Sequence, residues 1–254
     1  MKSDIVICLP ARYRSSRLPG KPLLEIAGKP LIIWALESAA KINARQVLVA
    51  TDDIRIQRVV ESAGYHAIIT SAEHQSGTDR IAEVAAIMPW SDDTIVVNYQ
   101  GDEPMTPKVN IEQLIQALND NPKASVATLY QPINNYQDLI NPNHVKLVTD
   151  NAGYALYFSR APIPYSRDSF AHWQLDENIQ YKHHIGLYAY RAKFLKIFSQ
   201  LRMSNLEKTE SLEQLRAMSH GYKIITQQVK QPMPHGIDTK DDIIKFEQSL
   251  QNAK

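Results

Sequence analysis

Short apolar runs alternate with helix-like segments through the first half of the chain. Residues 5–9 are continuously apolar, and strand-like runs recur at 47–50, 66–70, 94–98 and 125–129. Continuous apolar runs are typical of strands buried on both faces of a sheet. Segments with helical spacing lie between them, at 31–42, 54–63, 78–88 and 111–118. This alternation predicts an α/β fold with a Rossmann-like, mostly parallel sheet wrapped by helices.

The pattern changes in the second half of the chain. Two strand-like runs, 144–149 and 154–159, flank the turn sequence 150–153 and predict an antiparallel hairpin. A strand at 185–190, helices at 194–201 and 206–218, a strand at 222–229 and a closing helix at 241–250 follow. We therefore expect residues 1–130 and 221–254 to form an α/β core, with a smaller inserted α+β lobe at 131–220.

Composition narrows the possible functions. The 254 residues are 44% hydrophobic and 22% charged, with a formal net charge of +1 and no long Lys/Arg run, so nucleic acid is not an expected partner. The first apolar run is too short for a signal peptide, and nothing approaches the ~20 apolar residues of a membrane span. A cytoplasmic protein without membrane insertion is expected. The single cysteine, Cys8, lies in the first apolar run and is expected to be a buried thiol.

A cluster of basic residues follows the first predicted strand. Arg12, Arg14, Arg17 and Lys21 lie within ten residues of one another, with no acidic residue among them. Ligands of open α/β sheets bind beyond the carboxyl ends of the strands, where this loop is expected. Four neighbouring cations repel one another unless an anion is supplied, and a triphosphate supplies it. The sequences G-x-G-x-x-G and G-x-x-x-x-G-K-[ST] are absent from the chain, which disfavours dinucleotide dehydrogenases and P-loop NTPases.

Acidic residues follow another buried strand. Asp102 and Glu103 come directly after Gly101, at the end of the apolar run 94–98. Carboxylate oxygens suit Mg²⁺, which also binds substrate phosphates and polarises them. We expect Asp102 to be a ligand and Glu103 to be a turn or packing residue. Asp238, just before the last helix, is either a helix N-cap or a second metal ligand.

Taken together, these segments resemble the 3-deoxy-manno-octulosonate (Kdo) cytidylyltransferases, whose fold is of the nucleotide-diphospho-sugar transferase type. The resemblance extends along nearly the whole chain, at residues 10–23, 74–80, 97–104, 141–143, 153–160, 184–188, 210–216 and 236–239. It implies CTP as donor, an eight-carbon sugar acid (Kdo) as acceptor, CMP-Kdo and pyrophosphate as products for lipopolysaccharide synthesis, and Mg²⁺ as cofactor. It also implies a homodimer, with the hairpin near 145–158 as the contact.

The resemblance further assigns roles to individual residues. It implies a catalytic role for Lys21, Arg12, Asp102 and Asp238, the last two as Mg²⁺ ligands. The nucleotide-binding residues it implies are Arg12, Ser15 and Lys21 on the triphosphate, and Ser76, Gly77, Asp79 and Arg80 on the cytidine side. The residues it implies for the sugar acid are Gln100, Arg160, His184, Tyr188, Glu213 and Gln214.

The chemistry and spacing of these side chains fit the binding of a sugar acid. A guanidinium such as that of Arg160 can donate two parallel hydrogen bonds to a carboxylate. Glu210, Glu213 and Gln214 have the spacing i, i+3, i+4, which places them on one face of the helix predicted at 206–218.

Three positions depart from the family pattern. His183 stands where Arg is common, Lys240 where Pro is usual, and Pro234-His235 where a small residue precedes Gly236. Because His carries less positive charge than Arg at neutral pH, an 8-amino analogue of Kdo is the alternative acceptor. A catalytically inactive nucleotide-sugar binding or regulatory protein is a further alternative, disfavoured by the presence of Lys21 and both aspartates.

Overall fold

The structure, a computed structural model, describes residues 4–14, 18–172 and 174–252. The chain divides into two compact units. Unit 1 consists of Met1–Glu112, Tyr190–Ser199 and Met233–Lys254, and unit 2 of Gln113–Ala189 and Gln200–Pro232. These boundaries differ from those expected for a core and an inserted lobe, since 113–130 and 221–232 belong to unit 2. The assignment of sugar binding and dimerisation to residues 131–220 stays a prediction.

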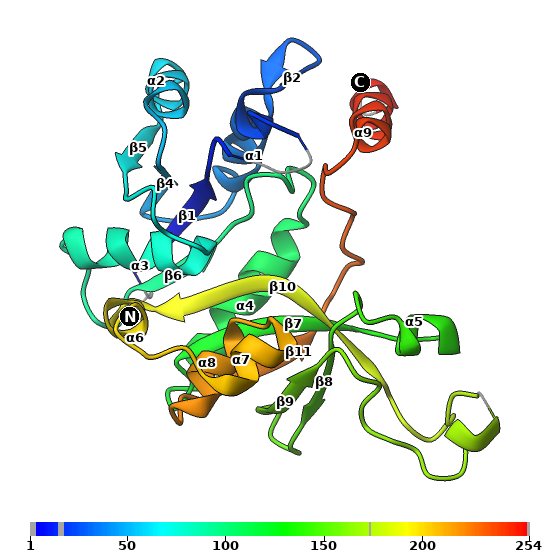
Figure 1. The fold of residues 1–254 in the computed structure, drawn as a ribbon. Coiled ribbons are helices and arrows are strands. Elements are labelled where there is room, and N and C mark those ends of the chain that lie inside the picture. The colour runs from blue at the N-terminus through cyan, green and yellow to red at the C-terminus, as the bar shows by residue number, and fades with distance from the viewer. Residues whose placement is uncertain (1–3, 15–17, 173, 253–254) are drawn as a thin grey trace. The chain divides into compact units, whose positions relative to one another are not determined.

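Unit 1 contains a parallel sheet in the order β6-β1-β4-β5. Residues Val6–Leu9 at its centre are wholly buried, as their continuous apolar sequence predicts. Figure 1 shows β1, β4 and β5 side by side. The strands of this unit are β1 (Ile5–Ala11), the short hairpin pair β2 (Glu25–Ile26) and β3 (Lys29–Pro30), β4 (Gln46–Thr51), β5 (His66–Ile69) and β6 (Ile95–Asn98).

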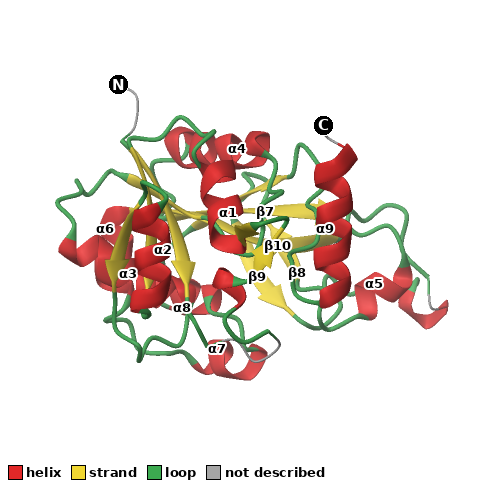
Figure 2. Ribbon diagram, turned by 90° about the horizontal axis from the view of Figure 1, so that it is seen from above, coloured by secondary structure: helices red, strands yellow, loops and turns green. Residues whose placement is uncertain are grey.

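Helices flank this sheet, and α1, α2 and α3 all contact its strands (Figure 2). Side-chain caps define where two of them begin: Asp53 accepts a hydrogen bond from Arg55 N in front of α2, and Ser76 accepts one from Asp79 N in front of α3. The prediction of a mostly parallel α/β sheet flanked by helices is confirmed. The helices of unit 1 are α1 (Leu31–Ala39), α2 (Ile54–Ser62), α3 (Gly77–Ile87), the first turn of α4 (Lys108–Asp120), α6 (Ala192–Phe198) and α9 (Lys240–Asn252).

Unit 2 is a mixed α+β structure. Its strands β7 and β11 are parallel, β8 pairs antiparallel with β10, and β8 and β9 form the predicted antiparallel hairpin. The strands are β7 (Val126–Pro132), β8 (Lys146–Thr149), β9 (Ala155–Ser159), β10 (Lys182–Arg191), whose last two residues belong to unit 1, and β11 (Ile224–Gln228). The remainder of α4 and the helices α5 (Tyr136–Ile140), α7 (Asn205–Glu210) and α8 (Gln214–Ser219) complete the unit.

The prediction of one helix over 206–218 is wrong. The chain forms α7 and α8 instead, separated at Ser211, whose φ of 53° is left-handed. A left-handed residue cannot continue a right-handed helix. Residues 210, 213 and 214 therefore do not share the face of one helix.

Two further expectations concern the chain as a whole. Within the described ranges, every helix is too short or too polar to cross a bilayer. Cys8 is a buried free thiol, as predicted, and burial raises its pKa.

Candidate active site

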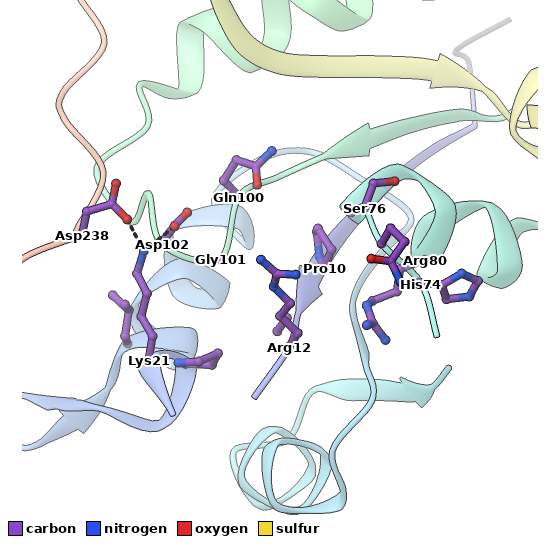
Figure 3. A pocket seen from close by; sticks show the side chains of 15 residues that line it. Pro10, Arg12, Lys21, His74, Ser76, Arg80, Gln100, Gly101, Asp102 and Asp238 are labelled. Atoms are coloured by element: carbon purple, nitrogen blue, oxygen red, sulfur yellow. Dashed lines mark hydrogen bonds and ion pairs between the residues drawn. The ribbon is translucent and has the colours of Figure 1, made fainter. Parts of the chain in front are cut away.

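A pocket of about 300 Å³ lies at the carboxyl ends of β1 and β6, entirely within unit 1. Its wall combines the end of β1, the turn after β6, the N-terminus of α3 and the segment before α9. In Figure 3, Lys21 reaches toward two aspartates on one side, and a second group of side chains lies opposite, with Arg12 between them. The labelled residues on the two sides are Lys21, Asp102 and Asp238, and His74, Ser76 and Arg80.

Lys21 pairs with two acidic residues of this pocket. Its ammonium donates to Asp102 Oδ2 at 2.5 Å and to Asp238 Oδ1 at 2.9 Å. The side chain of Lys21 is 10% exposed, whereas those of the two aspartates are 38% and 36% exposed. The acidic partners of Lys21 lie outside the basic loop, at positions 81 and 217 residues further along the chain.

Local backbone geometry aims Lys21 at the pocket. Gly20 has φ 69° and precedes the 3-10 helix Lys21–Leu23, which Pro22 favours at its first turn. Gly20 N donates to Tyr13 O at 3.1 Å, and the ring of Tyr13 lies so close that a Cβ on Gly20 would be 3.2 Å from it. A larger residue at position 20 is therefore strained both by its φ and by this contact.

The carboxylate of Asp238 is brought to the pocket by its neighbour in the chain. Ile237 N donates to Asp102 O at 2.9 Å, and the Ile237 side chain is buried in a cluster with Ile26 and Phe246. Of the two roles considered for Asp238, helix capping falls to the next residue, since Thr239 Oγ1 accepts from Asp242 N at 3.3 Å. The carboxylate of Asp238 faces Lys21 instead.

The donor set suits a divalent cation. Asp102 Oδ2 and Asp238 Oδ1 bond the same nitrogen, so one ion at that place can reach both oxygens. Mg²⁺ is typically held by one or two carboxylates, with water and substrate phosphates completing its shell. Groups of three or more His, Cys, Asp or Glu suited to a metal are absent from the part of the chain that the structure describes. Two carboxylates therefore fit Mg²⁺ better than a closed, all-protein metal site.

The opposite side of the pocket is built on the N-terminus of α3. Ser76 and Gly77 line it there, and a Cβ on Gly77 would lie 3.2 Å from Pro10 Cγ, so the helix approaches β1 closely. Arg80, one turn further on, also lines the pocket, although its side chain is only 3% exposed. Backbone N–H groups at a helix N-terminus and a guanidinium both favour anions.

Not every residue expected for the nucleotide lies in this wall. Ser15 is outside the described residues. Asp79 is not part of the pocket lining; its carboxylate accepts a hydrogen bond from Ser76 Oγ at 2.9 Å. The other expected nucleotide residues and Gln100 do line the pocket, together with His74, which the sequence did not single out.

Comparison with known proteins agrees with this arrangement. The family model described as "Cytidylyltransferase" matches residues 5–224. Curated 3-deoxy-manno-octulosonate cytidylyltransferases from Pseudomonas fluorescens and Nitrosococcus oceani are 49% and 47% identical to this chain. The alignments cover 99% and 96% of this chain, and 100% and 95% of the relatives. The chain belongs to the 3-deoxy-manno-octulosonate cytidylyltransferase family.

Solved structures support the assignment of this cytidylyltransferase. A structure of CMP:2-keto-3-deoxy-manno-octonic acid synthetase complexed with CTP has a TM-score of 0.89 and 43% identity, covering 99% of this chain and 100% of that one. The bifunctional IspDF from Campylobacter jejuni, at 15% identity and a TM-score of 0.62, covers 96% of this chain and 54% of its own, and shows the fold alone.

Unit 2 of the cytidylyltransferase holds most of the residues expected for the sugar acid. Arg160 follows β9, and its guanidinium donates to Glu210 O at 2.7 Å and to Pro142 O at 2.9 Å. The Glu210 carboxylate, which the wrong helix prediction had placed beside 213 and 214, accepts from Ser159 Oγ at 2.6 Å and from Arg160 N at 2.9 Å. Glu210 thus holds the end of β9 and the backbone N–H of Arg160 in place.

His184 is buried in the same unit. Its Nε2 lies 3.0 Å from Thr128 Oγ1, and its ring packs on those of Phe158 and Tyr188. Burial, with a smaller contribution from His183, lowers the pKa of His184 to about 3, so the ring is neutral at physiological pH. Glu213 and Gln214 stand at the start of α8, where the Gln214 side chain is buried.

Burial shifts the pKa of two residues of this cytidylyltransferase for which the sequence indicated no such shift. Lys146 in β8 is wholly buried, its ammonium donates to Asn141 O at 2.8 Å, and burial together with the charge of Arg160 lowers its pKa to about 8. Burial and the neighbouring charge of Asp102 raise the pKa of Glu103, interpreted as a turn or packing residue, to about 7. Apolar neighbours in sequence do not reveal such burial, which arises only when distant segments pack.

Proposed function

We propose that this protein transfers CMP from CTP to the anomeric C2 hydroxyl of Kdo, releasing pyrophosphate and providing the activated sugar for lipopolysaccharide synthesis. The observation that carries the proposal is the meeting of Lys21 with Asp102 and Asp238 in one pocket, with Arg12 and Arg80 on its wall. A solved synthetase complexed with CTP that aligns with 99% of this chain supports it.

The pocket suits a triphosphate because its cations can change partners. Lys21 is held by two carboxylates that are each more than a third exposed, so a phosphate oxygen can replace one of them at modest cost. Arg12 is exposed and Arg80 buried, which gives the phosphate chain one adaptable and one fixed guanidinium. Ser76 and Gly77 offer the N-terminus of α3 to the nucleotide.

Asp102 and Asp238 would hold Mg²⁺ when CTP is bound. The ion supplies positive charge that stabilises the phosphates and the leaving pyrophosphate. Lys21, whose ammonium lies beside both aspartates, would contact the phosphates of the same nucleotide.

The reaction is an in-line displacement. The C2 oxygen of the sugar acid forms a bond to the α-phosphorus while the bond from that phosphorus to the bridging oxygen breaks. The proton of the hydroxyl passes to solvent water, and the bond electrons leave with pyrophosphate. Lys21 and Arg12 stabilise the charge that develops on the phosphoryl oxygens, so positioning and electrostatics account for most of the rate.

The remaining assignments belong to the same proposal. The proposed ligands of the sugar acid are those that the family resemblance implies, Gln100, Arg160, His184, Tyr188, Glu213 and Gln214. The protein acts in the cytoplasm as a homodimer, and the β8–β9 hairpin, on which Leu156 is 60% exposed, is the proposed contact. Sedimentation of a Leu156→Asp variant as a monomer would support this contact, and an unchanged dimer would reject it.

A pyrophosphate-release assay tests the reaction. We expect release only when CTP, Mg²⁺ and Kdo are all present, with UTP a poor donor and EDTA abolishing turnover. The 8-amino analogue of Kdo serves as the competing acceptor, and its kcat/KM should be lower than that of Kdo. Pyrophosphate release that is no faster with Kdo than without an acceptor would reject the proposed function.

A further inference from the structure

Asp52 connects two separate parts of the nucleotide pocket without lining it. It follows β4, and its side chain is 13% exposed. One carboxylate oxygen, Oδ1, accepts from Tyr13 N at 3.3 Å, and the other, Oδ2, accepts from Arg80 Nη2 at 3.1 Å. The first contact reaches the loop that carries Arg12, and the second reaches helix α3 on the opposite side.

The contact with Arg80 fixes a buried charge. Besides Asp52, the guanidinium of Arg80 donates to Thr70 Oγ1 at 2.5 Å and to Ser71 O at 3.3 Å. Glu83 also lies near Arg80. Burial acts to raise the pKa of the Glu83 carboxyl, but hydrogen bonds from Ser71 N and His74, with a smaller contribution from the charge of Arg80, lower it overall. A guanidinium held on several sides has one orientation, and Asp52 supplies the charged acceptor among these contacts.

The contact with Tyr13 holds the backbone next to Arg12. Tyr13 directly follows Arg12, its carbonyl accepts from Gly20 N at 3.1 Å, and its ring lies against Gly20. The guanidinium of Arg55 covers that ring at 3.5 Å from its centroid. Tyr13 therefore links the residue next to Arg12 with Gly20, the neighbour of Lys21, and Asp52 holds the backbone of Tyr13.

We propose that Asp52 is a positioning residue that sets Arg12 and Arg80 in one geometry, so that both engage the same nucleotide. The proposal rests on the proposed function, since it takes the pocket ligand to be CTP. Asp52 itself touches no substrate and acts through Arg80 and the Tyr13 backbone. Its loss should therefore weaken nucleotide binding selectively, leaving the affinity for the sugar acid unchanged.

Calorimetric titration of CTP in the presence of Mg²⁺ and the absence of sugar acid tests the proposal. The variant Asp52→Asn keeps the size of the side chain but loses the charge and one acceptor oxygen. We expect it to raise the Kd of CTP about tenfold, the effect of losing one charge-assisted hydrogen bond. The KM for Kdo at saturating CTP should stay within twofold of wild type.

Asp4→Asn is the matched control. Asp4 is another ion-paired acid of unit 1 and undergoes the same chemical change, but it pairs with Arg45 and lies outside the pocket lining. CTP binding by Asp52→Asn that equals that of Asp4→Asn would overturn the proposal. So would an equal rise in the KM for Kdo, because a general loss of structure has that effect.

A second variant covers the case in which Asp52→Asn does not fold. Arg80→Lys keeps the positive charge but removes the guanidinium group that bonds to Asp52. It should weaken CTP binding and leave the KM for Kdo unchanged. An unchanged Kd for CTP in a folded Arg80→Lys protein would overturn the proposal. Wild-type protein that binds CTP but does not turn over Kdo would reject the proposed reaction alone, because these titrations contain no sugar acid.

Discussion

The charged groups around Lys21 in the pocket of unit 1 differ in their surroundings from two buried titratable residues of unit 2, Lys146 and His184. In the pocket, the Lys21 ammonium meets two carboxylates that remain more than a third exposed. In unit 2, the buried Lys146 donates to a main-chain carbonyl, and burial lowers the pKa of Lys146 to about 8 and of His184 to about 3.

The contrast separates exchangeable from fixed interactions. A partly exposed ion pair costs little to open, so its members can pass to a phosphate or a metal ion. Buried groups bonded to carbonyls have no such freedom, because each lost bond leaves a polar atom without water. The ion pairs of Lys21 can thus change partners, whereas the buried groups of unit 2 keep one arrangement.

The largest effect should come from the buried ion pair of unit 2. Arg216 Nη2 donates to Glu207 Oε1 at 2.6 Å, with side chains only 8% and 6% exposed. Glu207→Gln leaves the guanidinium without its counter-charge and should lower the free energy of unfolding by about 3–5 kcal/mol. Urea denaturation measures this loss. Lys21→Met, which opens a more exposed pair, should cost no more than about 1 kcal/mol by the same method; equal losses would remove the distinction between the two regions.

Catalysis should show the reverse order. Lys21→Ala removes the cation nearest the two aspartates and should lower kcat about 10²- to 10³-fold, as expected for one preorganised electrostatic contact. Pyrophosphate release under saturating CTP and Kdo measures it. Lys29→Ala is the control, because Lys29 forms an equally short ion pair with Glu37, at 2.6 Å, outside the pocket. Comparable losses in both variants would mean that Lys21 has no special role.

Sequence predicted the parts of this molecule that depend on local pattern. The strands near 5–9, 47–50 and 94–98 are continuous apolar runs, and such runs have few alternatives to a buried sheet. The helix expected at 206–218 failed because Ser211 turns left-handed and Glu210 bonds to the end of β9. Asp102 and the basic loop were located by their place after strands, but the pairing of Lys21 with Asp238 joins segments 217 residues apart. Contacts of that range, and the burial of Lys146, follow from packing that no local pattern records.

The pH dependence of stability should be smaller and should arise in unit 2. Burial, and for His183 also the charges of His144 and Lys146, lowers the pKa of His183 to about 4 and of His184 to about 3 from 6.5. The folded protein therefore binds fewer protons than the unfolded chain below pH 6.5, and stability falls as the pH drops from 6.5 toward 4. Each histidine should contribute a slope of roughly 1.4 kcal/mol per pH unit.

Urea denaturation between pH 7 and pH 5 of a His184→Gln variant isolates this contribution. The variant should lose one histidine's share of the slope, whereas His235→Gln, at an exposed position in unit 1, should keep the wild-type slope. A slope unchanged by His184→Gln would show that this ring is not buried neutral in the folded protein.

The smallest effect compares one helix cap in each unit. Ser76 caps α3 at the pocket, and Ser204 caps α7 in unit 2 through a capping box with Glu207. Replacing either serine by alanine should cost about 1 kcal/mol of stability, because one N–H group of the first turn loses its acceptor. Only Ser76→Ala should also weaken CTP binding, since Ser76 lines the pocket whereas Ser204 belongs to the fixed structure of unit 2. Thermal denaturation and CTP titration of both variants measure the two effects. If Ser204→Ala weakened CTP binding as much as Ser76→Ala, nucleotide affinity would depend on general stability rather than on the pocket, and the functional contrast between the two regions would be lost.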